Sequence, residues 1–345
     1  MGRTEYDPIK KKAIRKRTLV SAAMIFLAVP VLLVLSTLLD GGKFYMIFSL
    51  VVIICCMAPF FMVFEKRKPK AREIVLIAMM SAITVVAHMF LHVTIPIQIG
   101  TALVIVAGIA MGPEAGFLVG ALARFVCNFY MGQGPWTPWQ MFCWGLLGFL
   151  GGLAFNKVDM NKVTDQVKSR DFQVVMGPVL CIAAAEVFAF VSYLLWPDSS
   201  ADAMMMDGFN GFLEALKNAD GIKGLLNLMA TMIGWRVYAF GAAGLAAGVL
   251  LQKNRLPVDN VTLTLFTFFT TLILYGGLIN MCTMFTSAAM AGSGGISWNT
   301  LRVLYITGLP YDIMHASAAA FCMFLIGNPM ICKIERIKIK YGIYK

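Results

Sequence analysis

Residues 112–155 read GPEAGFLVGALARFVCNFYMGQGPWTPWQMFCWGLLGFLGGLAF, and this stretch decides the fold. It holds two apolar runs, 115–131 and 139–155, joined by a turn rich in glycine, proline and tryptophan. Glycines recur four residues apart in or beside both runs: Gly112, Gly116 and Gly120, then Gly148 and Gly152. Small residues at this spacing let two helix backbones approach closely in lipid. We therefore expect two membrane helices packed against each other.

The composition extends this expectation to the whole chain. Hydrophobic residues make up 59% of the 345 residues and charged residues 14%, with a mean hydropathy of +0.77. A soluble domain typically carries about 25% charged residues, and a spanning helix needs about 20 apolar ones. The predicted fold class is all-α, a polytopic membrane helix bundle. Ten apolar segments are expected: 18–39, 44–64, 72–92, 99–111, 115–131, 139–155, 172–196, 222–251, 259–286 and 309–333.

The net charge of +11 gathers in basic clusters beside the apolar segments. Lys and Arg are concentrated in five places: 1–18, 65–72, 157–170, 252–257 and 333–345. This is the distribution that the positive-inside rule describes for short cytoplasmic loops, and it argues against nucleic-acid binding. An even number of segments then puts both termini in the cytoplasm. The acidic loop 197–221 falls on the outer side.

Segment 99–111 is too short to cross a bilayer. Its 13 residues reach about 20 Å as a helix, against a hydrocarbon core of about 30 Å. It is therefore a partial span or a helix packed inside the protein. Interrupted segments mark binding sites in many transporters, whereas a kinked structural helix is the plainer alternative.

The chain has no GxxxxGK[ST] loop that would cradle the phosphates of ATP, so active transport would need a partner ATPase or an ion gradient. Two charged residues within the apolar segments are compatible with a transporter driven by an ion gradient. Glu186 and Arg124 could couple a secondary transporter, since charges at bilayer depth are costly and usually functional. Arg124 could instead pair with Asp312 or contact an external ligand.

A membrane metalloenzyme is the third and weakest alternative. His88 and His92 stand four residues apart, and with His315 they are the 3 histidines of the chain. The i, i+4 spacing can bind a metal, but the glutamate of a zinc-protease motif is missing between them. We predict neither a metal site nor a cofactor, and no catalytic residues.

The turn 128–140 carries the densest set of binding groups. Glycines and prolines fix an irregular backbone there, while tryptophans and amides supply flat rings and hydrogen-bonding groups. A small organic ligand needs such a combination of aromatic walls and a few polar groups. An aromatic belt at the lipid headgroups is the alternative interpretation.

The quoted stretch resembles the central helices of substrate-binding (S) components of energy-coupling factor (ECF) vitamin transporters. YGGLINMCTMF and GLPYDIMHASAAAFCMFLIGNPM resemble the last two helices of that family. The resemblance implies a bacterial cell-membrane subunit, not an enzyme, that binds a vitamin. Its partners would be a transmembrane coupling subunit and two cytoplasmic ABC ATPases. Docking on the coupling subunit would use a small-residue face, here Ala78 and Ala82.

The expected substrate-binding residues are Arg124, Asn128, Gln133, Trp136, Trp139, Gln140, Asn280, Asp312, His315 and His92. A cobalamin-type corrinoid is the first ligand that we expect, with a queuosine precursor or another vitamin as alternatives. The N-terminus lacks the Met-His arrangement of nickel and cobalt relatives.

Family members typically have six helices, so about four are additional here. We predict an N-terminal pair in 1–71 and the first part of the core in 72–155. An inserted pair would follow in 156–257, and the second part of the core with a basic tail in 258–345.

Overall fold

The structure is a computed structural model, and it describes residues 71–94, 98–155, 169–195, 221–251, 255–291 and 298–343, with the single positions Val31, Val51 and Lys217. These residues are almost entirely helical, which confirms the all-α fold class. The elements are α4 (Ala71–Thr94), α5 (Ile99–Met111), α6 (Pro113–Met131), α7 (Thr137–Ala154), α8 (Ser169–Leu195), α10 (Gly221–Leu251), α11 (Asn260–Thr270), η2 (Thr271–Gly276), α12 (Gly277–Ala291), α13 (Trp298–Cys322), η3 (Met323–Gly327) and α14 (Asn328–Lys340).

The predicted segments from 72–92 to 259–286 each correspond to an observed helix or helix run. Segments 18–39 and 44–64, and the acidic loop 197–221, fall largely outside the described residues. The last segment differs, because its helix begins at Trp298 and not at residue 309. Pro310 lies inside this helix. The preceding turns stay helical because Leu301, Tyr305 and Leu309 are buried on one face in a cluster with Tyr238 of α10.

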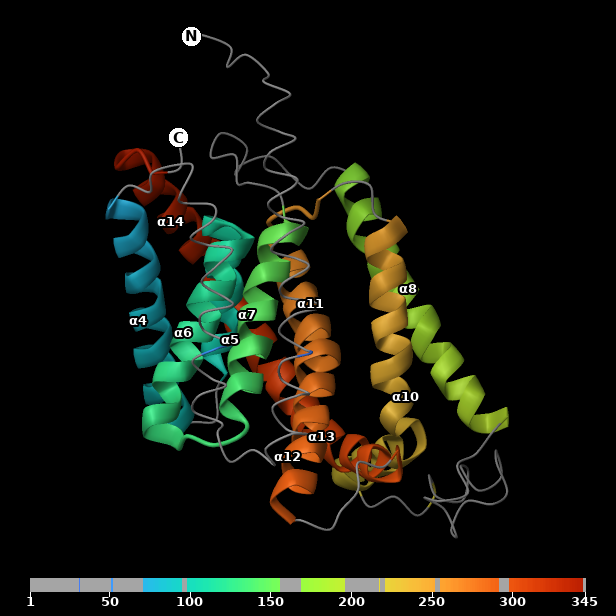
Figure 1. The fold of residues 1–345 in the computed structure, drawn as a ribbon. Helices are drawn as coiled ribbons and strands as arrows, with labels where there is room; N and C mark the ends of the chain where they lie inside the picture. The colour runs from blue at the N-terminus through green and yellow to red at the C-terminus, as the bar shows by residue number, and fades with distance from the viewer. Residues whose placement is uncertain are drawn as a thin grey trace.

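The helices form a bundle of three groups (Figure 1). Helices α4 to α7 stand on one side, the pair α8 and α10 on the other, and the run from α11 to α13 between them. The start of α4 and the end of α14 lie at the same end of the bundle. Among the described residues, three helical stretches are long and apolar enough to cross a membrane: Ala71–Leu91, Asn260–Ser287 and Thr300–Lys340. The structure therefore supports a multi-pass membrane protein.

The short helix α5 is enclosed by the rest of the bundle. All its residues from Gly100 to Met111 are buried. It packs against α4, α6 and α7, and also against α13 and α14. Of the two expected alternatives, a partial span and a helix packed inside the protein, the structure shows the second. Enclosure removes the requirement that its 13 residues span the bilayer.

Glycines bring α5, α6 and α7 into backbone contact. A Cβ atom on Gly108 would lie 1.8 Å from the carbonyl oxygen of Gly148, and one on Gly116 would lie 2.4 Å from Cα of Gly108. A Cβ on Gly120 would come within 2.6 Å of the Trp144 backbone. No side chain larger than hydrogen fits such contacts. The close approach predicted from the glycine spacing is confirmed.

The connection between α5 and α6 also needs glycine. Gly112 has φ of +105°, a conformation that residues with a Cβ rarely adopt. Its N–H donates to the Gly108 carbonyl at 2.8 Å, and Pro113 occupies the first turn of α6. Proline is well suited there because its missing N–H would have no helical partner. One residue thus ends one helix and starts the next.

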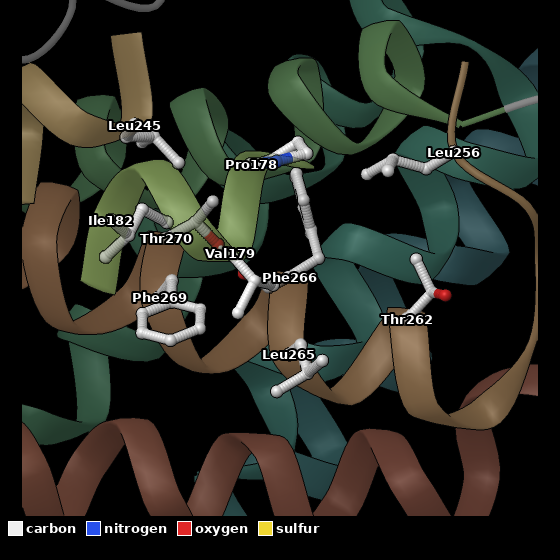
Figure 2. A pocket seen from close by; sticks show the side chains of 10 residues that line it. All are labelled: Pro178, Val179, Ile182, Leu245, Leu256, Thr262, Leu265, Phe266, Phe269 and Thr270. Carbon is white, nitrogen blue, oxygen red and sulfur yellow. Dashed lines mark hydrogen bonds between the residues drawn. The ribbon is translucent and has the colours of Figure 1, made fainter. Parts of the chain in front are cut away.

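The pair α8 and α10 is packed through small residues. A Cβ on Gly244 would lie 2.8 Å from the carbonyl oxygen of Cys181, and one on Gly248 would lie 2.8 Å from Cα of Pro178. Toward α11 the fit is looser. A cavity of about 50 Å³ remains there, with walls from Pro178, Ile182, Leu245, Phe266 and Phe269 (Figure 2).

Gly108→Ala should lower the apparent melting temperature of the purified protein in detergent. The added Cβ must push α5 away from α7, and over-packing of this kind typically costs about 1–3 kcal/mol. Gly177→Ala is the matched control, since a Cβ on this exposed residue of α8 meets nothing within 4 Å. Equal melting temperatures for the two variants would contradict the role given to the glycine contact.

Candidate functional site

The turn between α6 and α7 is organised by the hydroxyl of Thr137. Its Oγ1 donates to Oε1 of Gln133 at 2.8 Å. It accepts from Nδ2 of Asn128 at 3.1 Å and from the backbone N–H of Gly134 at 3.1 Å. Gly132, with φ of +102°, lets the chain leave α6 sharply enough for these groups to meet. The amides of the turn are therefore held in fixed positions.

Arg124 extends this network toward the interior of the helix bundle. Oε1 of Gln140 accepts from Nδ2 of Asn128 at 2.8 Å and from Nε of Arg124 at 3.0 Å. A guanidinium group only donates, so Nε2 of His88, 3.3 Å from Nη1, is the acceptor of a second bond. Arg124, Asn128 and Gln140, three residues expected from the sequence, are brought together.

The charge of Arg124 is buried among neutral partners. The residue is 8% exposed, and its guanidinium lies 5.2 Å from the centre of the Trp144 ring. Within the described part of the chain, no carboxylate lies at ion-pairing distance from it. The hydrogen bonds use two of its five N–H donors. Arg124 can therefore still donate to an anionic or carbonyl-bearing ligand.

Two tryptophans beside this network carry unused donors. Trp139 is 3% exposed and stacks on Phe285 of α12, with ring centres 5.7 Å apart. Trp144 is 1% exposed and meets the edge of the His88 ring. Neither indole N–H has a hydrogen-bond partner among the described residues. A buried donor without a partner is costly, so these groups are ready to bind an acceptor.

A second polar cluster joins α10, α12 and α13. Oδ2 of Asp312 accepts from the hydroxyl of Tyr238 at 2.5 Å and from Nδ2 of Asn280 at 2.8 Å. The ring of Tyr238 stacks on that of Tyr305, with centres 4.5 Å apart. Asn280 and Asp312, both predicted, are thus in direct contact. Asp312 bonds to these neutral groups and not to Arg124.

His315 lies one turn beyond Asp312 on α13. Its Nε2 is 3.1 Å from Oγ1 of Thr101 on α5, and its ring meets the edge of Tyr275 at 4.6 Å between centres. Tyr275 belongs to η2, a π-helical turn of the kind often found at functional positions. His315 therefore connects the central helix α5 to the run from α11 to α12.

Four other predicted residues contribute no side-chain contact to these clusters within the described part of the structure. Trp136 is 39% exposed, and its indole N–H donates to the Gly132 carbonyl at 3.4 Å. His92 is on the last turn of α4, and its side chain lies outside the described part of the structure. Ala78 and Ala82 are exposed on α4.

The residues of the alternative hypotheses do not meet. Glu186 on α8 faces α10, where a Cβ on Gly241 would lie 2.8 Å from its Oε1, while Arg124 is on α6 in the other group of helices (Figure 1). His88 and His315 belong to separate clusters. In the described ranges, no three His, Cys, Asp or Glu side chains are grouped closely enough to hold a metal.

Sequence reasoning missed Trp144, Thr101 and Tyr238 as parts of these clusters. Trp144 could have been found, because it follows Gln140 by four residues on the same face of α7. Tyr238 carried no signal, since nothing in the sequence of α10 indicates that it reaches Asp312.

Residues 68–212 match the family model described as ECF-type riboflavin transporter, S component. The match supports an ECF S component. It includes α4 to α7, which carry Arg124, Asn128 and Trp139. No curated protein and no solved structure matches the chain. S components are transporter subunits and not enzymes, so the match and the apolar helices support a membrane-embedded substrate-binding subunit of an ECF transporter for a vitamin.

Thr137→Val should loosen the turn between α6 and α7. The change keeps the shape but removes the hydroxyl that binds Gln133, Asn128 and the Gly134 N–H. Loss of such buried bonds costs about 1–3 kcal/mol, and we expect a lower melting temperature with faster hydrogen exchange at residues 132–137. Thr307→Val is the control, since the exposed Thr307 hydroxyl bonds only to carbonyls of its own helix. Unchanged exchange in the Thr137 variant would contradict the assignment.

Proposed function

We propose that this chain is the S component of an ECF-type importer and that its ligand is a vitamin with a flat ring system bearing carbonyl groups. The match of residues 68–212 to the S-component family model carries this proposal. The polar and aromatic groups of α6 and α7 lie within the matched range, and they supply the hydrogen-bond donors that such a ligand needs.

The unused donors favour a ligand with acceptor atoms. Arg124 and the indole N–H groups of Trp139 and Trp144 all donate, and they are buried within one region of α6 and α7. Trp139 and Phe285 stack on each other, and this aromatic pair is a surface on which a planar ligand could pack. The description of the matching family makes riboflavin the first candidate. A cobalamin-type corrinoid and a queuosine precursor remain the competing ligands.

We assign the ligand-binding roles by chemistry. Arg124 and Trp139 donate to ligand acceptors, Asn128 and Gln140 hold Arg124 in position, and Gln133 fixes the turn. Asn280, Asp312 and His315 form the α12–α13 side of the site, with Trp136 and His92 at its outer edge. The core would comprise 72–155 and 258–345, with additional helix pairs in 1–71 and 156–257.

Purified protein without ATP should bind riboflavin, measured by quenching of flavin fluorescence. Trp139→Phe keeps an aromatic ring on Phe285 but removes the indole N–H. We expect binding to weaken roughly 5- to 150-fold, the equivalent of about 1–3 kcal/mol. Trp136→Phe, an exposed position, is the matched control and should weaken binding far less.

The same titration with cobalamin, followed by calorimetry, separates the ligands. Binding of cobalamin in place of riboflavin would overturn the flavin assignment and leave the S-component role intact. Absence of binding to every vitamin tested would overturn both.

The outward face of α4 is the proposed contact with the coupling subunit. Ala78 and Ala82 are exposed there together with apolar neighbours such as Ile74 (51% exposed), Met79 (52%) and Val86 (68%). Small residues four apart permit a close helix crossing in lipid. The expected partners are a transmembrane coupling subunit and two cytoplasmic ABC ATPases.

Replacing Ala78 and Ala82 together by leucine should abolish co-purification of the coupling subunit and both ATPases, because the added side chains keep a partner helix at a distance. Vitamin binding by the isolated variant should stay unchanged. Ala183→Leu with Ala243→Leu, two exposed alanines on α8 and α10, is the control and should retain the complex. Retention of the complex by the α4 variant would place the coupling contact elsewhere.

A further inference from the structure

The bond between Tyr238 and Asp312 ties an additional helix to the candidate site. Tyr238 lies on α10, in the range 156–257 that we propose as an inserted helix pair, whereas Asp312 lies on α13 of the proposed core. The side chain of Tyr238 is 4% exposed, and its hydroxyl donates to Oδ2 of Asp312 at 2.5 Å. An additional helix therefore supplies a hydrogen bond to a residue that we propose as ligand-binding.

The helical backbone of α10 is interrupted one turn before Tyr238. Gly234 has φ of +37° and ψ of −119°, a conformation that residues with a Cβ rarely adopt. A Cβ there would lie 2.7 Å from Cγ1 of Ile306 on α13. Membrane helices tolerate such an interruption only where it is enclosed by protein, and Gly234 is buried. This close contact holds the next turn of α10, which carries Tyr238, against α13.

Glycines make room for the carboxylate of Asp312 and for its second partner, Asn280. A Cβ on Gly276 would lie 2.7 Å from Cγ of Asp312, and one on Gly308 would lie 2.4 Å from Oδ1 of Asn280. Nδ2 of Asn280 donates at 2.8 Å to the same Oδ2 that the Tyr238 hydroxyl reaches. Because rotation of the carboxylate would break both bonds, they fix its orientation.

The other oxygen of Asp312 is left for a ligand. Among the described residues, Oδ1 has no hydrogen-bond donor. A carboxylate inside a membrane protein is costly unless it is hydrogen-bonded, and its two oxygens can accept about four bonds. An ionised carboxylate only accepts, so its complement is an N–H or O–H donor of the ligand.

The first turn of α5 connects this polar cluster to the network of Arg124. Oγ1 of Thr101 is 3.1 Å from Nε2 of His315 on α13. The preceding residue, Gly100, packs on Trp144, since a Cβ there would lie 2.6 Å from Cη2 of the indole. The guanidinium of Arg124 lies 5.2 Å from the centre of the same indole ring. Donors on the side of α6 and α7 and an acceptor on the side of α13 therefore border one region.

We propose that Tyr238 is a positioning residue that sets the ligand preference, because it aims Oδ1 of Asp312 at a ring N–H that lies between two carbonyl groups of the ligand. This inference rests on the proposed vitamin-binding function. The pyrimidine ring of riboflavin carries such an N–H, at N3, between two carbonyls. The carbonyls suit the donors of Arg124 and the indoles, and the N–H suits Asp312. The inserted helix pair then takes part in ligand selection.

Riboflavin and 3-methylriboflavin, which lacks this N–H, provide the test. Quenching of flavin fluorescence gives the dissociation constant of each for the purified full-length protein without ATP. We expect the unmodified protein to prefer riboflavin roughly 10-fold or more, because the methyl compound leaves Asp312 without its donor. Tyr238→Phe keeps the aromatic ring but removes the hydroxyl. It should weaken binding of riboflavin and leave binding of 3-methylriboflavin nearly unchanged, so that the preference falls several-fold.

Tyr305→Phe is the matched control. It removes the hydroxyl of the ring that stacks on Tyr238, and this hydroxyl donates to the Gly277 carbonyl and not to Asp312. The preference for riboflavin should persist in this variant. Tyr238→Phe added to Asp312→Asn should cause no further loss of preference, since the group that Tyr238 positions is already changed. Melting temperatures in detergent check that each variant is folded.

Three results would overturn the proposal. Equal affinity of the unmodified protein for both flavins would mean that the N–H does not face Asp312, and this comparison needs no variant. A preference retained in Tyr238→Phe would show that the hydroxyl does not position the carboxylate. Equal losses for the two flavins in that variant would leave Tyr238 a packing role alone. Failure of the proposed function is a different result, because the unmodified protein would then bind neither flavin.

Discussion

The backbone contact of α5, α6 and α7 is the interaction on which the rest of the structure depends. In a bilayer, lipid chains are as apolar as leucine, so helices associate through close packing and hydrogen bonds. Gly108, Gly116 and Gly148 allow three backbones to touch, and this contact encloses α5. A 13-residue helix without such an enclosure would leave its ends in hydrocarbon, where unsatisfied backbone groups are costly.

The polar network at the other end of α6 and α7 follows from this contact. Because the two helices are fixed against each other, Arg124 on one and Gln140 on the other stay within 3.0 Å. The buried guanidinium can then be oriented by Asn128 and Gln140, with no carboxylate among the described residues at ion-pairing distance. A cation held by neutral groups keeps its attraction for an anionic or carbonyl-bearing ligand, whereas a salt bridge would neutralise its charge.

Much of this arrangement was predictable from local sequence. Gly112-Pro113 predicted the end of α5. The amides of Asn128 and Gln140 predicted a set of hydrogen-bonding groups at the turn. Long-range partners were not predictable. The bond between Tyr238 and Asp312 joins two residues that are 74 positions apart in the sequence, and no pattern in either helix indicates the other. The start of α13 at Trp298 was also missed, because burial of Tyr305 and Leu309 against α10 outweighs the local effect of Pro310.

The central claim is that this chain binds a vitamin and depends on partner ATPases to move it. Uptake of radiolabelled riboflavin into proteoliposomes tests it most directly. We predict uptake when the protein is reconstituted with a coupling subunit, two ATPases and ATP, and none with the protein alone under a proton or sodium gradient. Gradient-driven uptake by the chain alone, abolished by Glu186→Gln, would contradict the account and establish a secondary transporter.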